Sequence, residues 1–239
     1  MILKTRKLIK LLAGARMRDG LRDGVAAAIE HSPILRQRPY VSIFDVGGNK
    51  GQFALAARHW QPSAEIYSFE PLTFEADRFE RVFDKDEHVT LHRYALGSAA
   101  GEATIHVSAR SDSSSLLPIS DLQSHFFPGT QEADTQTIQV RRLDEVLQRE
   151  DCDSRVLLKI DVQGFELEVL RGAEGLLSEI DDIYVECSFV ELYEGQALAS
   201  DVIDFLSGKG YRLTGMYNPS YDKSGLAIQA DFAFERVHA

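Results

Sequence analysis

Residues 44–53, FDVGGNKGQF, place one carboxylate and three glycines between a short apolar run and a segment of helical composition. Glycine has no Cβ, so the backbone of such a turn can bend tightly and approach another group closely. The turn lacks the dinucleotide fingerprint G-x-G-x-x-G, because the residue two positions after Gly47 is Asn49. Asp45 would repel a pyrophosphate and favours a ligand that carries an ammonium or sulfonium group.

Segments with strand composition alternate with segments of helical composition along most of the chain. The predicted strands are 40–46, 64–70, 88–96, 155–162 and 181–189, and the predicted helices are 52–60, 74–83, 165–177 and 199–210. This alternation predicts βαβ units that build a parallel sheet. Two further strands, 211–217 and 230–237, are joined by a loop without a crossover helix, which favours an antiparallel pair at the edge of the sheet.

The predicted fold is therefore a doubly wound α/β domain with a mostly parallel, seven-stranded sheet whose last strand is antiparallel. Segments 102–108 and 135–143 alternate polar with apolar residues and predict an inserted β-hairpin. The stretch between them, 109–134, contains a Ser-, Pro- and Gly-rich segment and is predicted to be a loop or lid. Ligands of such a sheet bind where the parallel strands end.

One sizeable core suits a chain of 239 residues, of which 44% are hydrophobic and 26% charged. We divide it into an N-terminal amphipathic helical segment, 1–35, and a single domain, 36–239, with the insertion at about 100–142.

No apolar run approaches the about 20 residues that a membrane-spanning helix needs. Cys152 and Cys187 suggest neither a disulfide framework nor a metal site, so we expect a reducing, cytoplasmic location.

Charge is distributed unevenly. The first 24 residues hold seven basic and two acidic residues, whereas the whole chain has a net charge of −11. An acidic main body argues against nucleic acid as the principal partner, because phosphate binding needs a basic face.

Leu8, Leu11, Leu12 and Ala15 recur at near-helical spacing and predict an amphipathic helix. This basic helix either caps the domain or makes a peripheral contact with a membrane or a partner.

Further acidic residues follow the predicted strands. Glu70 ends the second strand, where a carboxylate can accept hydrogen bonds from both hydroxyls of an adenosine ribose. Asp161 lies at the end of an apolar strand, so we expect it at the same edge of the sheet. Glu166 begins the next helix, where it either favours the helix dipole or takes part in a site. Asp161 and Glu166 could bind Mg²⁺, but two acids from one turn are too few to predict a metal.

Four motifs lie at these strand ends and in the insertion: DVGGNKGQF (45–53), FEP (69–71), SSSLL (113–117) and KIDVQGFE (159–166). Together they resemble the FkbM-type methyltransferases, a family with the class I S-adenosylmethionine-dependent fold. The resemblance covers roughly residues 41–217. In the first motif Gly48 replaces the family's alanine, and in the last Gln163 replaces its usual glutamate.

The resemblance implies methyl transfer from S-adenosylmethionine to a hydroxyl oxygen of a sugar, a glycan or a secondary metabolite. By position, it implies cofactor contacts from Asp45, Gly47, Gly48, Asn49 and Gly51, from Glu70 to the ribose, and from Ala95 and Leu96 to the adenine. It also implies that Asp161 faces the methyl donor and the acceptor. Ser114 and Ser115 either position the acceptor or belong to a flexible loop.

An alcohol acceptor must lose its proton, so we expect a general base within hydrogen-bond reach of it. Asp161 is the first candidate for this catalytic role and Glu186, near the end of a predicted strand, is the second. Histidine is the usual alternative, and His92, His106 and His125 lie in or near the predicted strand ends or lid.

Two other functions share parts of this pattern. An NAD-dependent oxidoreductase predicts a G-x-G-x-x-G turn or a Tyr-x-x-x-Lys pair, and none of the eight tyrosines has a lysine four residues later. A non-catalytic protein that binds the cofactor or a sugar nucleotide for a partner would share the same fold. Binding of S-adenosylmethionine rather than NAD separates the first alternative, and turnover separates the second.

Overall fold

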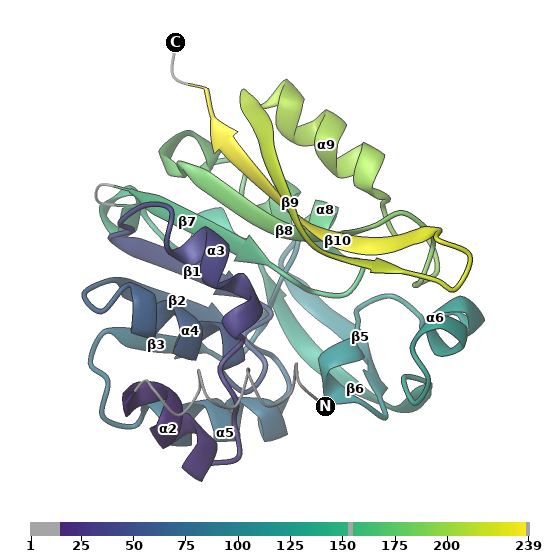
Figure 1. The fold of residues 1–239 in the computed structure, drawn as a ribbon, viewed down its shortest axis with the longest axis horizontal. Helices are drawn as coiled ribbons and strands as arrows, with labels where there is room; N and C mark the ends of the chain where they lie inside the picture. The colour runs from purple at the N-terminus through teal and green to yellow at the C-terminus, as the bar shows by residue number, and fades with distance from the viewer. Residues whose placement is uncertain (1–14, 153–154, 238–239) are drawn as a thin grey trace.

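The structure is a computed structural model that describes residues 15–152 and 155–237. Its main element is a seven-stranded sheet in the order β3-β2-β1-β7-β8-β10-β9 (Figure 1). The strands are β1 (Ser42–Val46), β2 (Glu65–Phe69), β3 (Val89–His92), β7 (Val156–Ile160), β8 (Asp182–Ser188), β9 (Tyr211–Tyr221) and β10 (Ala227–Arg236). Strand β10 is antiparallel to β8 and β9, and the other neighbouring pairs are parallel. The predicted sheet with an antiparallel last strand is confirmed.

Helices cover both faces of this sheet. They are α2 (Ala15–Arg22), α3 (Ser32–Leu35), α4 (Gln52–Trp60), α5 (Thr73–Phe83), α7 (Leu143–Val146), α8 (Glu166–Gly172) and α9 (Ala199–Gly208), with short 3-10 turns η1 (Ile29–His31), η3 (Arg149–Cys152) and η4 (Leu177–Glu179). Successive strand residues point to opposite faces. Ile43 and Leu157 pack with residues of α2 to α5, whereas Phe44 and Leu158 pack with residues of α7 to α9. Two hydrophobic cores therefore enclose the sheet.

The insertion forms a second, three-stranded sheet in the order β4-β6-β5. Its strands are β4 (Ala95–Leu96), β5 (Gly101–Ser108) and β6 (Glu132–Arg141), and β5 and β6 form the predicted antiparallel pair. The predicted loop or lid between them contains the turn η2 (Ser111–Ser113) and helix α6 (Asp121–Phe126). Figure 1 shows this insertion beside one end of the main sheet.

The predicted strand 88–96 is in fact two strands in different sheets. Strand β3 ends at His92, and Ala95 and Leu96 pair instead with β6 of the insertion. The chain leaves the main sheet at Arg93, whose guanidinium binds the carboxylates of Asp77 and Glu80 on α5. This exit directs β4 toward the edge of the site.

The predicted amphipathic helix lies largely outside the described residues, which include only its α2 portion. Leu8, Leu11 and Leu12 are among the residues not described. The segment that follows α2 buries Val25, Ala27 and Leu35 in the core next to α4. Over residues 15–152 and 155–237, no helix combines the length and the apolar character needed to cross a membrane.

Candidate active site

A cavity of about 400 Å³ opens at the carboxyl ends of β1, β2 and β7. The strand ends contribute Val46 to Asn49, Phe69 to Leu72, and the residues Lys159, Asp161, Val162 and Gln163. The insertion contributes Ala95, Leu96, Ile105, Ser111, Asp112, Ser114, Ser115 and Leu116, and the remaining wall is Ala26, Ala28, Glu30, His31, Gln52 and Phe53. This position, where parallel strands end, is the usual ligand site of doubly wound sheets.

Most residues predicted for the site line this cavity. They are Gly47, Gly48, Asn49, Glu70, Ala95, Leu96, Ser114, Ser115 and Asp161. Within the described ranges, the lining does not include Asp45, Gly51 or Glu186. The structure gives each of these three residues a different surrounding from the one predicted.

Asp45 is fully buried beneath the turn. Its Oδ1 lies 3.0 Å from Nζ of Lys159, and its Oδ2 accepts a hydrogen bond of 3.2 Å from the hydroxyl of Ser68. The two charged residues face each other because Asp45 and Lys159 are register partners in the parallel pair β1–β7. The charge of Asp45 is therefore compensated inside the protein. The prediction that Asp45 contacts a cationic ligand is therefore corrected. Asp45 supports the turn from beneath.

The glycines of the turn are required by neighbouring protein atoms. Gly47 has φ of 79°, and a Cβ there would overlap the backbone carbonyl of Asp161. Gly51 has φ of 89°, and a Cβ there would lie 2.7 Å from the ring of Phe83 on α5. Such close approaches exclude a side chain at either position. Gly51 is buried and does not line the cavity, so its predicted cofactor contact is corrected. Its role is to let α4 begin against α5.

Glu70 lies at the end of β2, buried but with a surface on the cavity. Its Oε2 accepts a hydrogen bond of 2.9 Å from the backbone N–H of Asn49, and its Oε1 accepts one of 2.8 Å from that of Leu72. Burial raises the pKa of Glu70 to about 7, although both hydrogen bonds oppose this rise. Each carboxylate oxygen keeps a further lone pair that a ligand hydroxyl could use.

Gln163 connects two acidic residues at the end of β7. Its Nε2 donates to Oδ1 of Asp161 and to Oε2 of Glu186, both at 2.8 Å, and its Oε1 accepts from the hydroxyl of Tyr193 at 2.8 Å. Its φ of 58° is in the left-handed region, which is uncommon for a residue other than glycine. The contacts of this side chain hold Asp161 in place at the cavity wall.

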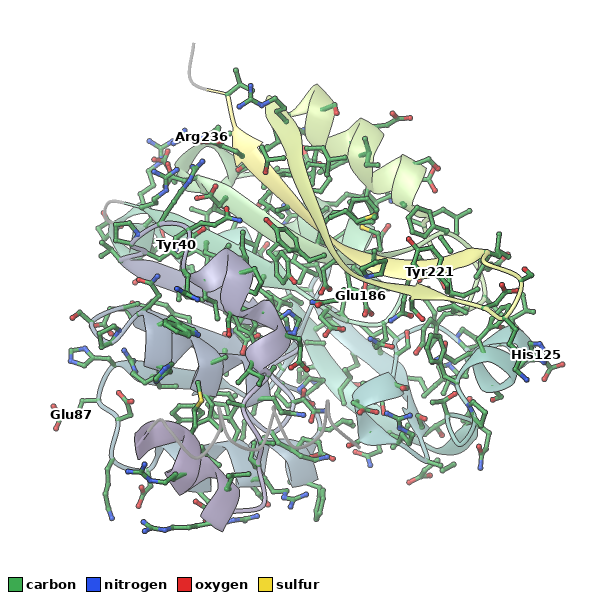
Figure 2. All side chains as sticks on the ribbon, in the orientation of Figure 1. Tyr40, Glu87, His125, Glu186, Tyr221 and Arg236 are labelled. Carbon is green, nitrogen blue, oxygen red and sulfur yellow. The ribbon has the colours of Figure 1, made fainter. Side chains whose placement is uncertain are left out.

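Glu186 lies near the centre of the molecule (Figure 2), and its Oε2 accepts the hydrogen bond from Gln163. Its Oε1 accepts a second amide hydrogen bond of 2.7 Å from Gln229. Burial, followed by the nearby charges of Asp161 and Asp231, raises the pKa of Glu186 well above its ordinary value. Glu186 is half-buried, each of its oxygens accepts an amide hydrogen bond, and within the described ranges it is not a lining residue, so it is poorly placed to take a proton from an acceptor in the cavity. This corrects its prediction as a second candidate base.

Glu166 is buried at the start of α8. Its Oε1 accepts hydrogen bonds from the backbone N–H groups of Val162, at 3.2 Å, and Gly164, at 3.0 Å. Burial raises the pKa of Glu166 to about 7. This carboxylate binds the turn that carries Asp161, so the two side chains are not presented together to the cavity.

The three histidines considered as alternative bases lie away from the cavity. His92 stacks on Phe69 with ring centroids 4.9 Å apart. His106 binds the carboxylate of Glu132 through Nδ1, at 2.6 Å. His125 is exposed on α6, at the outer edge of the insertion (Figure 2).

His31 and Lys159 are among the lining residues that were not predicted from the sequence. His31 reaches the cavity from η1, in a segment without a recognisable motif. Lys159 had a usable signal, because it is the one charged residue in the strand sequence VLLKI. A cation buried between apolar neighbours needs a carboxylate partner.

The sequence of this chain is similar to those of known proteins. The family model described as "Methyltransferase FkbM domain" matches residues 45–213. The chain is 28% identical over 201 residues to 2-O-methyltransferase NoeI of Sinorhizobium fredii, covering 79% of this chain and 81% of that protein. It is 28% identical over 151 residues to hexuronic acid methyltransferase AglP of Haloferax volcanii, covering 60% of this chain and 54% of that protein. Methyltransferase 1 of Beauveria bassiana is 27% identical over 184 residues, with 71% of each chain covered.

Proposed function

The chain belongs to the FkbM methyltransferase family, and we propose that it transfers the methyl group of S-adenosylmethionine to a hydroxyl oxygen of a sugar, a glycan or a secondary metabolite. The observation that carries this proposal is the meeting of three strand ends at one cavity. The glycine turn after β1, Glu70 after β2 and Asp161 after β7 all line it. Its volume of about 400 Å³ is within the range of roughly 300–1,000 Å³ that small-molecule sites occupy.

The lining residues fit S-adenosylmethionine. Glu70 would accept hydrogen bonds from the ribose hydroxyls, and the backbone of Gly47 to Asn49 would contact the amino acid part. Asp161 offers a carboxylate to a cationic ligand, a role first assigned to Asp45. Leu96 adds an apolar surface for the adenine. When bound, the cofactor supplies an electrophilic methyl group and leaves with the electrons of the broken carbon–sulfur bond.

The insertion forms part of the acceptor side of the cavity. Ser111, Asp112, Ser114 and Ser115 line it and provide hydroxyl and carboxylate groups that suit a ligand with several hydroxyls. The names of two relatives support this class of acceptor, since one is a 2-O-methyltransferase and the other a hexuronic acid methyltransferase.

Calorimetric titration tests the choice of cofactor. We expect the full chain to bind S-adenosylmethionine and S-adenosylhomocysteine, and NAD far more weakly. Glu70→Ala should weaken binding at least tenfold, because it removes the proposed ribose contact. Glu87→Ala is the matched control, since this exposed glutamate lies at the far edge of the molecule (Figure 2). Comparable binding of NAD would favour an oxidoreductase instead.

Transfer of a labelled methyl group tests the reaction itself. The full chain and labelled S-adenosylmethionine would be incubated with a panel of sugars, glycolipids and small hydroxylated metabolites, each with EDTA and with Mg²⁺. We expect label in a hydroxylated acceptor under both conditions. Loss of transfer with EDTA that Mg²⁺ restores would contradict a metal-independent reaction. Cofactor binding without transfer to any acceptor would favour a non-catalytic binding protein.

A further inference from the structure

His31 lines the cavity and is held by residues of the sheet beneath it. Its Nδ1 lies 2.9 Å from the hydroxyl of Tyr184 on β8 and 3.6 Å from Oδ2 of Asp231 on β10. The ring packs edge-on against Phe53 and Tyr184, with both pairs of centroids 5.5 Å apart. Only 16% of the side chain is exposed. The imidazole is therefore fixed in one orientation at the cavity wall.

The neighbouring hydrogen bonds determine which ring nitrogen carries the proton. The hydroxyl of Tyr184 donates to Oδ2 of Asp231 at 2.7 Å, and Nδ2 of Asn218 donates to the same oxygen at 2.7 Å. Because its proton is given to Asp231, the oxygen of Tyr184 can only accept from His31. The proton of neutral His31 is then on Nδ1, and Nε2 keeps a free lone pair.

We propose that Nε2 of His31 is the general base that takes the proton from the acceptor hydroxyl, with Tyr184 and Asp231 as positioning residues. This role rests on the proposed function. His31 lines the cavity, whereas Tyr184 and Asp231 are not among the lining residues of the described chain. Nδ1 therefore faces the sheet, and Nε2 is the nitrogen left for the ligand side.

The proposed step is balanced within the site. As the acceptor oxygen uses an electron pair to bond to the methyl carbon, the electrons of the broken carbon–sulfur bond stay on the sulfur, and the proton of the acceptor hydroxyl passes to Nε2 of His31. The resulting imidazolium donates through Nδ1 to Tyr184, whose hydroxyl remains bonded to the carboxylate of Asp231. The negative charge of Asp231 thus stabilises the positive charge that forms on His31. The proton then leaves to solvent and restores the base.

Charged groups around His31 come from several elements. Glu30 is its neighbour on η1, Lys159 and Asp161 lie at the end of β7, and Asp231 lies on β10. Burial lowers the pKa of His31, the carboxylate of Asp231 opposes this, and the ammonium of Lys159 lowers it further. His31 is therefore neutral near pH 7 and able to accept a proton, which is the state that a general base requires.

Asp161 is less suited to the same task, although it also lines the cavity. Its Oδ1 already accepts a hydrogen bond from Gln163. Asp161 is better placed to bind and orient a ligand. His31, Asn218 and Asp231 all lie outside the family-model match at 45–213, so the match alone does not point to this arrangement.

Nuclear magnetic resonance of the full chain, labelled with ¹⁵N-histidine, tests the arrangement without an acceptor. Long-range ¹H–¹⁵N correlation reports the tautomer of each histidine, and the His31 signal is assigned by its absence in His31→Asn. We expect the Nδ1–H tautomer with a pKa below 6.5 in the wild type, and a mixed tautomer in Tyr184→Phe. A proton on Nε2 in the wild type would overturn the proposal.

Kinetics with labelled S-adenosylmethionine and the acceptor found in the screen test the role. His31→Asn keeps a donor near the position of Nδ1 but has no counterpart of Nε2. We expect kcat to fall by about 10²–10⁴-fold, with cofactor affinity within twofold of the wild type. The matched control is His88→Asn. His88 is exposed and comes just before β3, at the end of that strand away from the cavity. Tyr184→Phe should lower kcat less and shift its pH profile.

Two results separate failure of this role from failure of the proposed function. If His31→Asn binds the cofactor normally and keeps more than a third of the wild-type kcat, the role is overturned and the methyltransferase function stands. If the wild type binds no S-adenosylmethionine, the proposed function fails and the role fails with it. Thermal melting of each variant shows whether a lower rate reflects unfolding.

Discussion

Nζ of Lys159 lies 3.0 Å from Oδ1 of Asp45, and this ion pair connects the central strand of the sheet, β7, to its neighbour β1 beneath the cavity. Their side chains are only 5% and 0% exposed. The ammonium also donates to the carbonyls of Val46, at 3.2 Å, and Gly47, at 2.9 Å. Burial favours the neutral amine, but the carboxylates of Asp45 and Asp161 raise the pKa of Lys159 above its ordinary value. One charged side chain thus fixes the turn from below.

Replacing this lysine should destabilise the protein strongly. Lys159→Met leaves the carboxylate of Asp45 buried without a cation, and breaking such a pair costs about 3–5 kcal/mol. Urea unfolding measures this loss. The control is Lys209→Met, because Lys209 pairs with Glu174 at an exposed site, where a pair is worth less than about 1 kcal/mol. A similar loss in both variants would show that the buried pair has no special role.

Gly47 should not tolerate even the smallest side chain. In Gly47→Ala the methyl group meets the carbonyl of Asp161, and φ of 79° alone is strained for alanine by about 1–3 kcal/mol. We expect a lower free energy of unfolding in urea and weaker binding of S-adenosylmethionine, because the turn must move. Gly208→Ala is the control, since no atom lies within 4 Å of a Cβ there and its φ is not positive. Wild-type stability in Gly47→Ala would contradict the close approach.

The fold was predictable because its signals are local. The apolar strand at β7 and the helical composition of α4 are contained in consecutive residues, and α4 begins and ends where the sequence predicts. Strand β3 was predicted too long because its end depends on a distant partner. The composition of Ala95 and Leu96 predicts a strand but not the sheet to which it belongs. They join the second sheet because they pair with Val140 and Arg141, which lie far away in the sequence.

The site was predictable only where a motif marks it. Glu70 and Asp161 follow strands and so meet at one edge, as parallel strands require. The burial of Asp45 depends on its register with Lys159, which composition does not reveal. His31 and Asp231 are 200 residues apart in the sequence and approach only through the packing of η1 on the sheet. No local pattern links such residues.

The pH dependence of stability should include a contribution from Glu166. Its folded pKa of about 7 lies above the ordinary 4.5, so between these values the folded state binds more protons than the unfolded state. The free energy of unfolding therefore falls as pH rises from 4.5 to 7, by up to about 3 kcal/mol from this residue. Glu166→Gln keeps an acceptor for Val162 and Gly164 but does not titrate. Urea unfolding at pH 5 and pH 8 should show a smaller difference in the variant, and an unchanged difference would contradict the assignment.

The amide of Gln163 should be essential because it donates to two carboxylates. Gln163→Glu removes both donors to Asp161 and Glu186 and brings three acidic side chains together. A hydrogen bond to a charged group is worth about 1.5–3 kcal/mol, so we expect a loss of about 3 kcal/mol or more at pH 8. The loss should shrink at pH 5, because carboxyl groups brought together bind protons more readily when folded, and protonation restores donors.

Urea unfolding at both pH values measures this loss of stability. Its pH dependence distinguishes repulsion between the carboxylates from the loss of the amide hydrogen bonds. Gln136→Glu is the control, since Gln136 is exposed on β6 and the same substitution there should change stability by less than about 0.5 kcal/mol. An equal loss at pH 5 and pH 8 in Gln163→Glu would point to the two lost amide hydrogen bonds rather than to charge repulsion. Wild-type stability at pH 8 would mean that the amide does not bridge the two acids.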